Sequence, residues 1–262
     1  IVGMFILDDA DSDRLALPKQ YGIDDVPLIV QDKAFNDNGS LRQRRHMFAS
    51  FGPLGDEILV NGTHDPYFEA TTTLVRLRLL NGSPARTHDF GFTDGRGFQV
   101  IATDSGLLEA PLETERVQLS PGERAEIVVR FSPGETATLR SFGPDLGQDF
   151  FSERFSGGDD TFDILQIRAS AQLAESPPLP EQLVARDAPD PNDIVTTRGF
   201  RLSGSSVNGQ RMDLTRVDQV VRTGSTEIWE VEAAGAHSFH IHLVRFLILD
   251  IDGEPPPPLL TG

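Results

Sequence analysis

The chain has 262 residues, and its 23 lysine and arginine residues against 40 aspartate and glutamate residues give a formal net charge of −17. This acidity argues against a nucleic-acid binder, which neutralises phosphates with Lys and Arg, and against attraction to an anionic membrane surface. No stretch approaches the roughly 20 apolar residues that span a bilayer, and no signal-peptide pattern is visible at the amino terminus. The chain has no cysteine, which excludes disulfides, zinc–thiolate sites and cysteine-ligated copper within it.

Short apolar runs between turn residues predict an all-β chain. The strand patterns cover residues 73–80, 125–131, 162–169, 226–232 and 239–251. Helical periodicity is confined to the brief segment 181–186, which follows a proline. We expect residues 132–160 to form a long surface loop, and the proline- and acid-rich residues 171–197 to form an interdomain linker.

The sequence contains an internal repeat. In one copy TLVRLRLLNG precedes HDFGFT, and in the other TEIWEVEAAG precedes HSFHIH; each copy continues into a strand pattern, a turn and proline. Gly91 of the first copy aligns with His240 of the second, and in the same way Thr93 aligns with His242. The fold therefore does not require imidazoles there, which makes structural necessity the weaker explanation for the two histidines.

Three of the six histidines, His237, His240 and His242, lie within six residues. On a strand, residues 240 and 242 face the same side with α-carbons about 6.5–7 Å apart, so they can bind one metal ion or serve two ions of a cluster. His237 has the opposite parity and is expected to point elsewhere. Neutral imidazole suits copper and zinc. The alternative is an ordinary surface or hydrogen-bonded core pair, the commoner fate of an isolated His-x-His.

Other residues are weaker candidates for a functional site. His88 aligns with His237 but has no partner imidazole nearby, His64 lies in a turn, and His46 follows a basic run. Trp229 is interpreted as a core or interdomain anchor. No nucleophile elbow, phosphate-binding loop or dinucleotide fingerprint is present. The sequence therefore predicts no catalytic side chain and no organic cofactor site.

Several motifs together resemble one family. The segment HSFHIHLV at 237–244 resembles the HPFHIHLV signature of the last cupredoxin domain in multicopper oxidases. Residues 17–32 resemble the start of their middle domain, especially in bacterial laccase-like and copper-efflux oxidases. The VNG at 60–62 and the SVNG at 206–209 fit the same pattern, and residues 1–9 resemble the closing strand of the first domain. The resemblance covers nearly the whole chain.

This resemblance implies cupredoxin-like Greek-key β-sandwich domains, one complete and one partial. It implies the tail of a first domain at 1–16, a middle domain at 17–170, a linker at 171–197 and the front part of a last, copper-binding domain at 198–262. It also implies a periplasmic or extracellular location.

The resemblance further implies oxidation of phenols, aromatic amines or metal ions, coupled to reduction of dioxygen to water by copper. By position, His237 corresponds to a type 1 copper ligand, His240 to a type 2 ligand and His242 to a type 3 ligand. The family's copper centres need four His-x-His pairs, one of them in a His-Cys-His segment, and this chain has one pair and no cysteine. We therefore expect an internal piece of such an oxidase, without turnover of its own.

Two alternatives stay open. The chain could be a non-catalytic copper- or zinc-binding cupredoxin-like module that uses His240 and His242, or a structural β-sandwich with vestigial histidines. The expected partners are copper ions, with dioxygen and a small reducing substrate once the centres are completed. Because the apolar strand expected at 239–251 would leave an open sheet edge, we also expect pairing with another copy or a complementary polypeptide.

Overall fold

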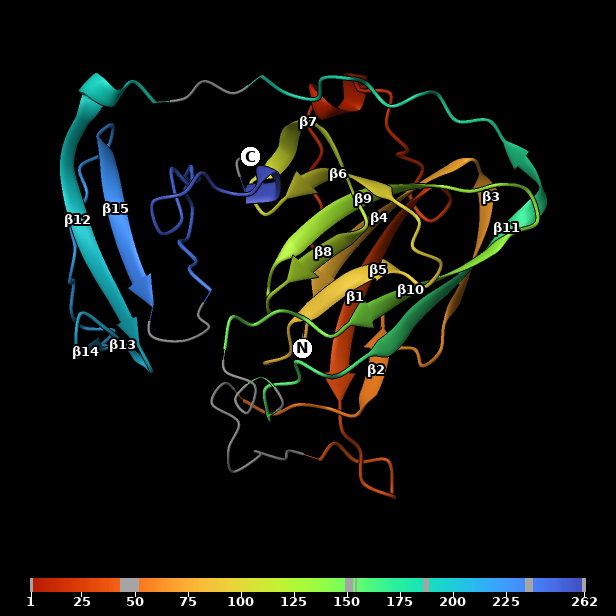
Figure 1. The fold of residues 1–262 in the computed structure, drawn as a ribbon, viewed down its shortest axis with the longest axis horizontal. Helices are drawn as coiled ribbons and strands as arrows, with labels where there is room; N and C mark the ends of the chain where they lie inside the picture. The colour runs from red at the N-terminus through yellow and green to blue at the C-terminus, as the bar shows by residue number, and fades with distance from the viewer. Residues whose placement is uncertain are drawn as a thin grey trace. The chain divides into compact units, whose positions relative to one another are not determined.

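The structure is a computed structural model that describes residues 2–42, 52–148, 153, 155–185, 189–233 and 238–260. The chain divides into two compact units (Figure 1). The first lies within Ile1–Asp145, Asp149–Ala185 and Phe246–Gly262, and the second within Leu146–Gln148 and Arg186–Arg245. Regular structure in the described residues consists almost entirely of strands, which confirms the predicted all-β class.

Two sheets form the first unit. One comprises, in spatial order, β2 (Glu57–Val60), β1 (Asp25–Lys33), β4 (Leu74–Asn81), β9 (Arg124–Arg130), β6 (Phe98–Thr103) and β7 (Gly106–Thr114). The other comprises β3 (Tyr67–Thr72), β11 (Phe162–Ala174), β10 (Thr136–Phe142), β5 (His88–Phe92) and β8 (Arg116–Leu119). Alternate side chains of both sheets, such as Leu77 of β4 and Leu139 of β10, are fully buried in one shared core. The unit is therefore a β-sandwich.

The outer face of the six-stranded sheet is also covered. Leu74 and Val128 face away from the main core and form a second apolar cluster with Leu17, Ile101 and Leu183. Leu183 belongs to the segment after β11 and donates its backbone N–H to the carbonyl of Glu109 at 2.8 Å. The segments before β1 and after β11 thus lie against the sheet and exclude water from it.

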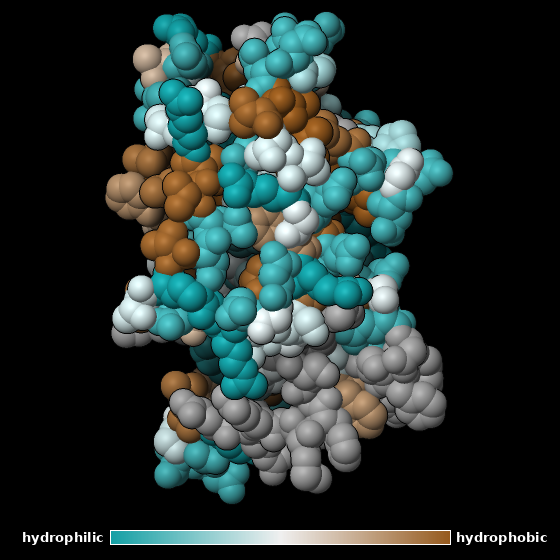
Figure 2. All heavy atoms as spheres, turned by 90° about the vertical axis from the view of Figure 1, so that its left-hand side faces the viewer, coloured by the Kyte–Doolittle hydropathy of each residue, from teal (hydrophilic) through white to brown (hydrophobic). Residues whose placement is uncertain are grey.

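The second unit has one small sheet. Its strands, in spatial order, are β14 (Gln210–Arg211), β13 (Ser206–Val207), β12 (Ile194–Ser203) and β15 (Thr226–Ala233). Large apolar side chains remain exposed on this unit, among them Met212, Leu214 and Val217 at 84%, 89% and 78%. Figure 2 shows brown apolar patches among hydrophilic residues on one face of the molecule. In the sheet of this unit, β15 is an edge strand, and none of the described strands pairs with its outer edge.

Three short 3-10 helices lie among the described residues: η1 (Ser12–Arg14), η2 (Pro191–Asp193) and η3 (Pro258–Leu260). Among the described residues, no helix has the length and apolar character needed to cross a membrane.

The structure confirms the internal repeat. In the first unit β1 pairs in parallel with β4 and antiparallel with β2; in the second, β12 pairs in parallel with β15 and antiparallel with β13. Each copy has an asparagine in the equivalent turn, Asn61 in the first and Asn208 in the second, and both have a φ of 51°. Asn61 accepts a bond from the Ile29 backbone N–H at 2.9 Å, and Asn208 accepts one from the Arg201 backbone N–H at 2.7 Å.

One local expectation is wrong. The loop expected at 132–160 contains β10, in which Ala137, Leu139 and Ser141 alternate inward; the surrounding Gly and Ser obscure this pattern in the sequence. The brief helical periodicity at 181–186 forms no helix in its described part, 181–185, where Leu183 packs against the sheet. The domain boundaries stay a prediction, although β11 ends and β12 begins inside the expected linker at 171–197.

Candidate metal centre

His240 and His242 lie side by side in the second unit. Their ring centroids are 4.9 Å apart and the ring planes meet at 79°. Both residues are exposed, so a metal ion can reach the imidazoles from solvent. The sequence therefore identified two donors that the structure brings together. His237 lies outside the described residues, and its proposed ligand role stays a prediction.

The strand expected at 239–251 is wrong. Between residues 238 and 250 the structure has no strand, and Leu243 adopts a φ of 69°, which interrupts an extended backbone. A strand is stabilised by hydrogen bonds to a neighbour, and none of the described strands pairs with this segment. The histidine rings therefore approach each other from an irregular segment, not from one face of a strand.

The two histidines do not by themselves make up a complete metal site. Among the described residues, no group of three or more His, Cys, Asp or Glu side chains could hold a metal ion. Imidazole nitrogen suits copper and zinc, so the donor chemistry of His240 and His242 fits part of such a centre. Any further donors must come from beyond the part of the chain that the structure describes.

Trp229 of β15 lies next to the irregular segment 238–250, which carries His240 and His242 and is called the histidine segment below. Its ring packs 4.4 Å from the ring of Phe200 and 6.4 Å from the ring of Phe239, centroid to centroid. Glu227 Oε2 accepts hydrogen bonds from Trp229 Nε1 at 3.0 Å and from Arg198 Nε at 2.7 Å. The sequence reading missed this cluster, although strand parity places residues 227 and 229 on one face of β15 and could have revealed part of it.

His88 has a different role from the paired histidines. It is fully buried, with Nε2 3.1 Å from Ser83 Oγ and Nδ1 2.9 Å from Ser141 Oγ. Burial, and secondarily the nearby charge of Arg86, lowers its pKa to about 3. Both ring nitrogens are engaged and the ring stays neutral. His88 is a structural core residue, which agrees with the missing partner imidazole in its sequence neighbourhood.

Two histidines remain, His64 and His46. His64 is half-exposed in its turn, with Nδ1 3.7 Å from Glu57 Oε2. His46 lies outside the described residues.

The comparison between the two repeat copies needs a correction at Gly91. A Cβ there would lie 2.8 Å from the carbonyl oxygen of Glu115 and 2.5 Å from Arg116 Cδ, because β8 crosses closely at this point. The first copy therefore excludes any side chain at this position for local steric reasons. The first copy therefore folds without an imidazole at this position. Because Gly91 is required there for steric reasons, its comparison with His240 does not show whether the second copy needs the histidine for its fold.

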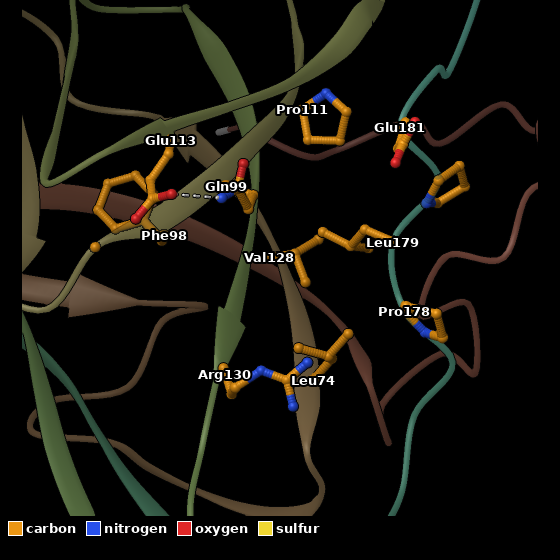
Figure 3. Close-up of a pocket in the computed structure, with 12 residues that line it drawn as sticks. Leu74, Phe98, Gln99, Pro111, Glu113, Val128, Arg130, Pro178, Leu179 and Glu181 are labelled. Carbon is orange, nitrogen blue, oxygen red and sulfur yellow. Dashed lines mark hydrogen bonds between the residues drawn. The ribbon is translucent and has the colours of Figure 1, made fainter.

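A separate groove lies on the outer face of the six-stranded sheet in the first unit, with a volume of about 570 Å³. Leu74, Phe98 and Val128 contribute apolar side chains from the sheet, and Leu179 approaches from the segment after β11 (Figure 3). Arg130 carries charge at its margin. Its lining comes from segments far apart in the sequence, so no local pattern predicts it.

Family models support the resemblance drawn from the motifs. Two models, both described as multicopper oxidase, match residues 32–138 and 176–259. The chain is also 37% identical over 268 residues to the cell division protein FtsP of Pectobacterium atrosepticum, and 35% identical over 271 residues to that of Proteus mirabilis. These alignments cover 98% and 100% of the chain but 55% and 56% of the relatives. The chain thus spans about half the length of the curated relatives it matches.

Solved structures give the same result. The laccase-like multicopper oxidase CueO of Ochrobactrum sp. superimposes with a TM-score of 0.84 at 30% identity, covering 97% of this chain and 60% of that one. A variant of the multicopper oxidase McoA of Aquifex aeolicus gives 0.81 at 28% identity, covering 97% and 59%. These likenesses confirm the cupredoxin-like fold class. The chain belongs to the multicopper oxidase family.

Proposed function

We propose that this chain is part of a copper-dependent oxidase that oxidises phenols, aromatic amines or metal ions and reduces dioxygen to water. The main support is the His240–His242 pair, whose rings lie 4.9 Å apart within the region matched by a multicopper oxidase model. The Ochrobactrum structure, whose description names oxidase activity towards lignin model compounds, adds support by its likeness. Bound copper would supply one-electron redox chemistry at this place.

We assign His237, His240 and His242 as copper ligands. Two of these imidazoles are described, both are exposed, and their donor nitrogens suit copper. Because this chain contains no cysteine, it cannot complete a type 1 centre by itself. The chain alone should bind copper without turning over substrate, and the full-length protein that contains it should be the oxidase.

Copper content tests this assignment. The chain is reconstituted with Cu(II), desalted and analysed for bound metal, beside the double variant His240→Ala/His242→Ala. We expect about one copper per chain, lost in the double variant, and no oxygen consumption by either. Retention of copper by the double variant would exclude the pair as ligands. In the full-length protein, oxygen consumption with a phenol should disappear in the same variant.

A role in cell division is the second candidate. It is favoured by relatives named cell division protein FtsP that are 35–37% identical over nearly the whole chain. In this case the β-sandwich acts as a binding module and copper is dispensable. Two strains test this candidate by cell length, one that lacks the protein and one that carries His240→Ala/His242→Ala. Filamentation of the first with normal length of the second supports a division role that does not need copper, and normal length of both contradicts it.

Domain organisation and location follow the same family reading. We propose the tail of a first domain at 1–16, a middle domain at 17–170, a linker at 171–197 and the front of a last domain at 198–262, in a periplasmic or extracellular protein. The open edge of β15 supports a further proposal, that a second copy or a complementary polypeptide covers it. Light scattering that finds only monomers of the isolated chain would contradict this pairing, and cell fractionation tests the location.

A further inference from the structure

The histidine pair has an anchor within the second unit. Phe239, which immediately precedes His240, is half-buried, whereas its neighbours Ser238 and His240 are exposed. The ring of Phe239 meets the ring of Trp229 edge-on, at 69° and 6.4 Å between centroids. Because no strand holds residues 238–250, this contact is the described aromatic link between the small sheet and the start of the histidine segment.

The indole is itself held in one orientation. On its other side it packs against Phe200 of β12 at 4.4 Å. Its Nε1–H donates to Glu227 Oε2 at 3.0 Å, and the Glu227 side chain is only 6% exposed. An aromatic ring fixed at one edge by a hydrogen bond and on its face by another ring has little rotational freedom left.

Arg198 makes this arrangement rigid. Its Nε and Nη2 donate to the two carboxylate oxygens of Glu227 at 2.7 and 3.0 Å, which is a bidentate pair. Nη1 donates to Gln219 Oε1 at 2.7 Å, and Nη2 also donates to the Val220 carbonyl at 3.0 Å. The arginine thus ties the loop before β15 to the carboxylate that holds the indole.

We propose that Trp229 is a positioning residue for the copper-binding pair, acting through Phe239 on His240 and His242. The inference rests on the proposed function in taking Cu(II) as the ion, whereas the placement of the imidazoles can be tested without metal. Held against the indole, the histidine segment presents both rings together before the ion arrives. Ligands that are arranged in advance lose less conformational freedom on binding, so the affinity for the ion rises.

The chain provides its own reporter for this place. Trp229 is the only tryptophan in the sequence, so all indole fluorescence comes from the residue that contacts the histidine segment. Cu(II) bound by neighbouring imidazoles quenches indole fluorescence. A titration therefore reports binding at this site, and not at the acidic surface elsewhere.

The test compares Cu(II) affinity, measured by chelator competition, in the wild type and in Trp229→Ala, Trp229→Phe and Phe239→Ala. We expect about tenfold weaker binding in Trp229→Ala and Phe239→Ala, and substantial recovery in Trp229→Phe, which keeps an aromatic ring at the contact. Quenching should be reduced in Phe239→Ala. Met212→Ala, at a side chain 84% exposed in the same unit, should match the wild type.

Phe239→Ala guards against simple unfolding, because this residue lies outside the β12–β15 sheet. If Phe239→Ala and Trp229→Ala bind Cu(II) as tightly as the wild type, the positioning role is wrong while the copper site survives. If the wild type binds no Cu(II), the proposed function fails, and the histidine ring proton shifts in NMR decide the positioning role. Shifts of His240 and His242 that move to random-coil values in Phe239→Ala support it, and unchanged shifts overturn it.

Discussion

Removing Asp25 should destabilise the first unit more than any surface ion pair does. The side chains of Asp25 and Arg78 are only 5% and 7% exposed, and they form a bidentate pair between the adjacent strands β1 and β4. Arg78 Nε and Nη2 donate to the two oxygens of Asp25, each at 2.7 Å. The third arm of Arg78 donates from Nη1 to Glu126 Oε1 at 2.9 Å.

The magnitude follows from burial. Asp25→Ala leaves a guanidinium that is almost completely removed from water and has lost two charge-assisted hydrogen bonds. Breaking a buried pair by removing one partner costs about 3–5 kcal/mol. Because Glu126 still contacts Arg78, we expect the lower end, about 3 kcal/mol. In a domain of this size that corresponds to a fall in Tm of roughly 6–12 °C.

Urea denaturation and calorimetry measure the loss. The control is Asp163→Ala, which removes the 59% exposed partner of Arg140 and should cost only about 0–1 kcal/mol. The double variant Asp25→Leu/Arg78→Met removes both charges and should recover much of the loss, since an apolar pair is often as stable as a buried ion pair. Equal effects of Asp25→Ala and Asp163→Ala would refute the reasoning.

Three further predictions concern the core and the response to acid. Folded His88 stays neutral because its pKa is about 3, whereas the same histidine in the unfolded chain binds a proton below about pH 6.5. This difference should lower the free energy of unfolding by about 2 kcal/mol at pH 5. In urea titrations at several pH values, His88→Asn should lack this part of the loss of stability with falling pH. Hydrogen bonds from Arg96 lower the pKa of Asp94 and of Glu135, so the stability lost in Arg96→Met should be largest above about pH 5 and shrink towards pH 3; a pH-independent loss would contradict this. Leu139→Ala creates a cavity at a fully buried site and should lower the unfolding free energy by about 2–5 kcal/mol; a loss below 1 kcal/mol would be inconsistent with that burial.

The burial of charge on β4 illustrates what a local pattern cannot predict. The sequence correctly placed a strand at 73–80, because its leucines and valine alternate with Arg76 and Arg78. Such alternation is typical of a strand whose polar side chains face water, yet both arginines are about 95% buried. Their partners Asp25 and Glu126 lie about 50 residues away along the chain, and no local pattern reports such distant pairings.

At the histidine segment, residue types were informative but the backbone structure was predicted wrongly. Residue types alone predicted His240 and His242 as metal ligands; the structure brings their rings together, and the ligand role stays a prediction. The strand expected at 239–251 was wrong because β propensity expresses itself only where a neighbouring strand can pair. The aromatic contact between Trp229 and Phe239 was not predictable either, since it depends on how the irregular segment returns to the sheet.

Register comparison of the two repeat copies supports the positioning role of Trp229. Asn61 bonds Ile29 and Asn208 bonds Arg201, and this alignment shifts β15 by one residue from the sequence repeat. The pair Val26 and Leu77 in the first copy then corresponds to the pair Arg198 and Trp229 in the second. In the first copy Leu77 fills a closed core, where it is fully buried. In the second, the same register position carries an indole, and its neighbour supplies the arginine that fixes the indole's carboxylate partner. The strand pairing of the repeat is retained, while an apolar pair in the first copy is replaced in the second by an oriented aromatic ring beside the histidine segment. This is the arrangement that the proposed positioning role requires, because function is carried by a local group of residues on a fold that also exists without it.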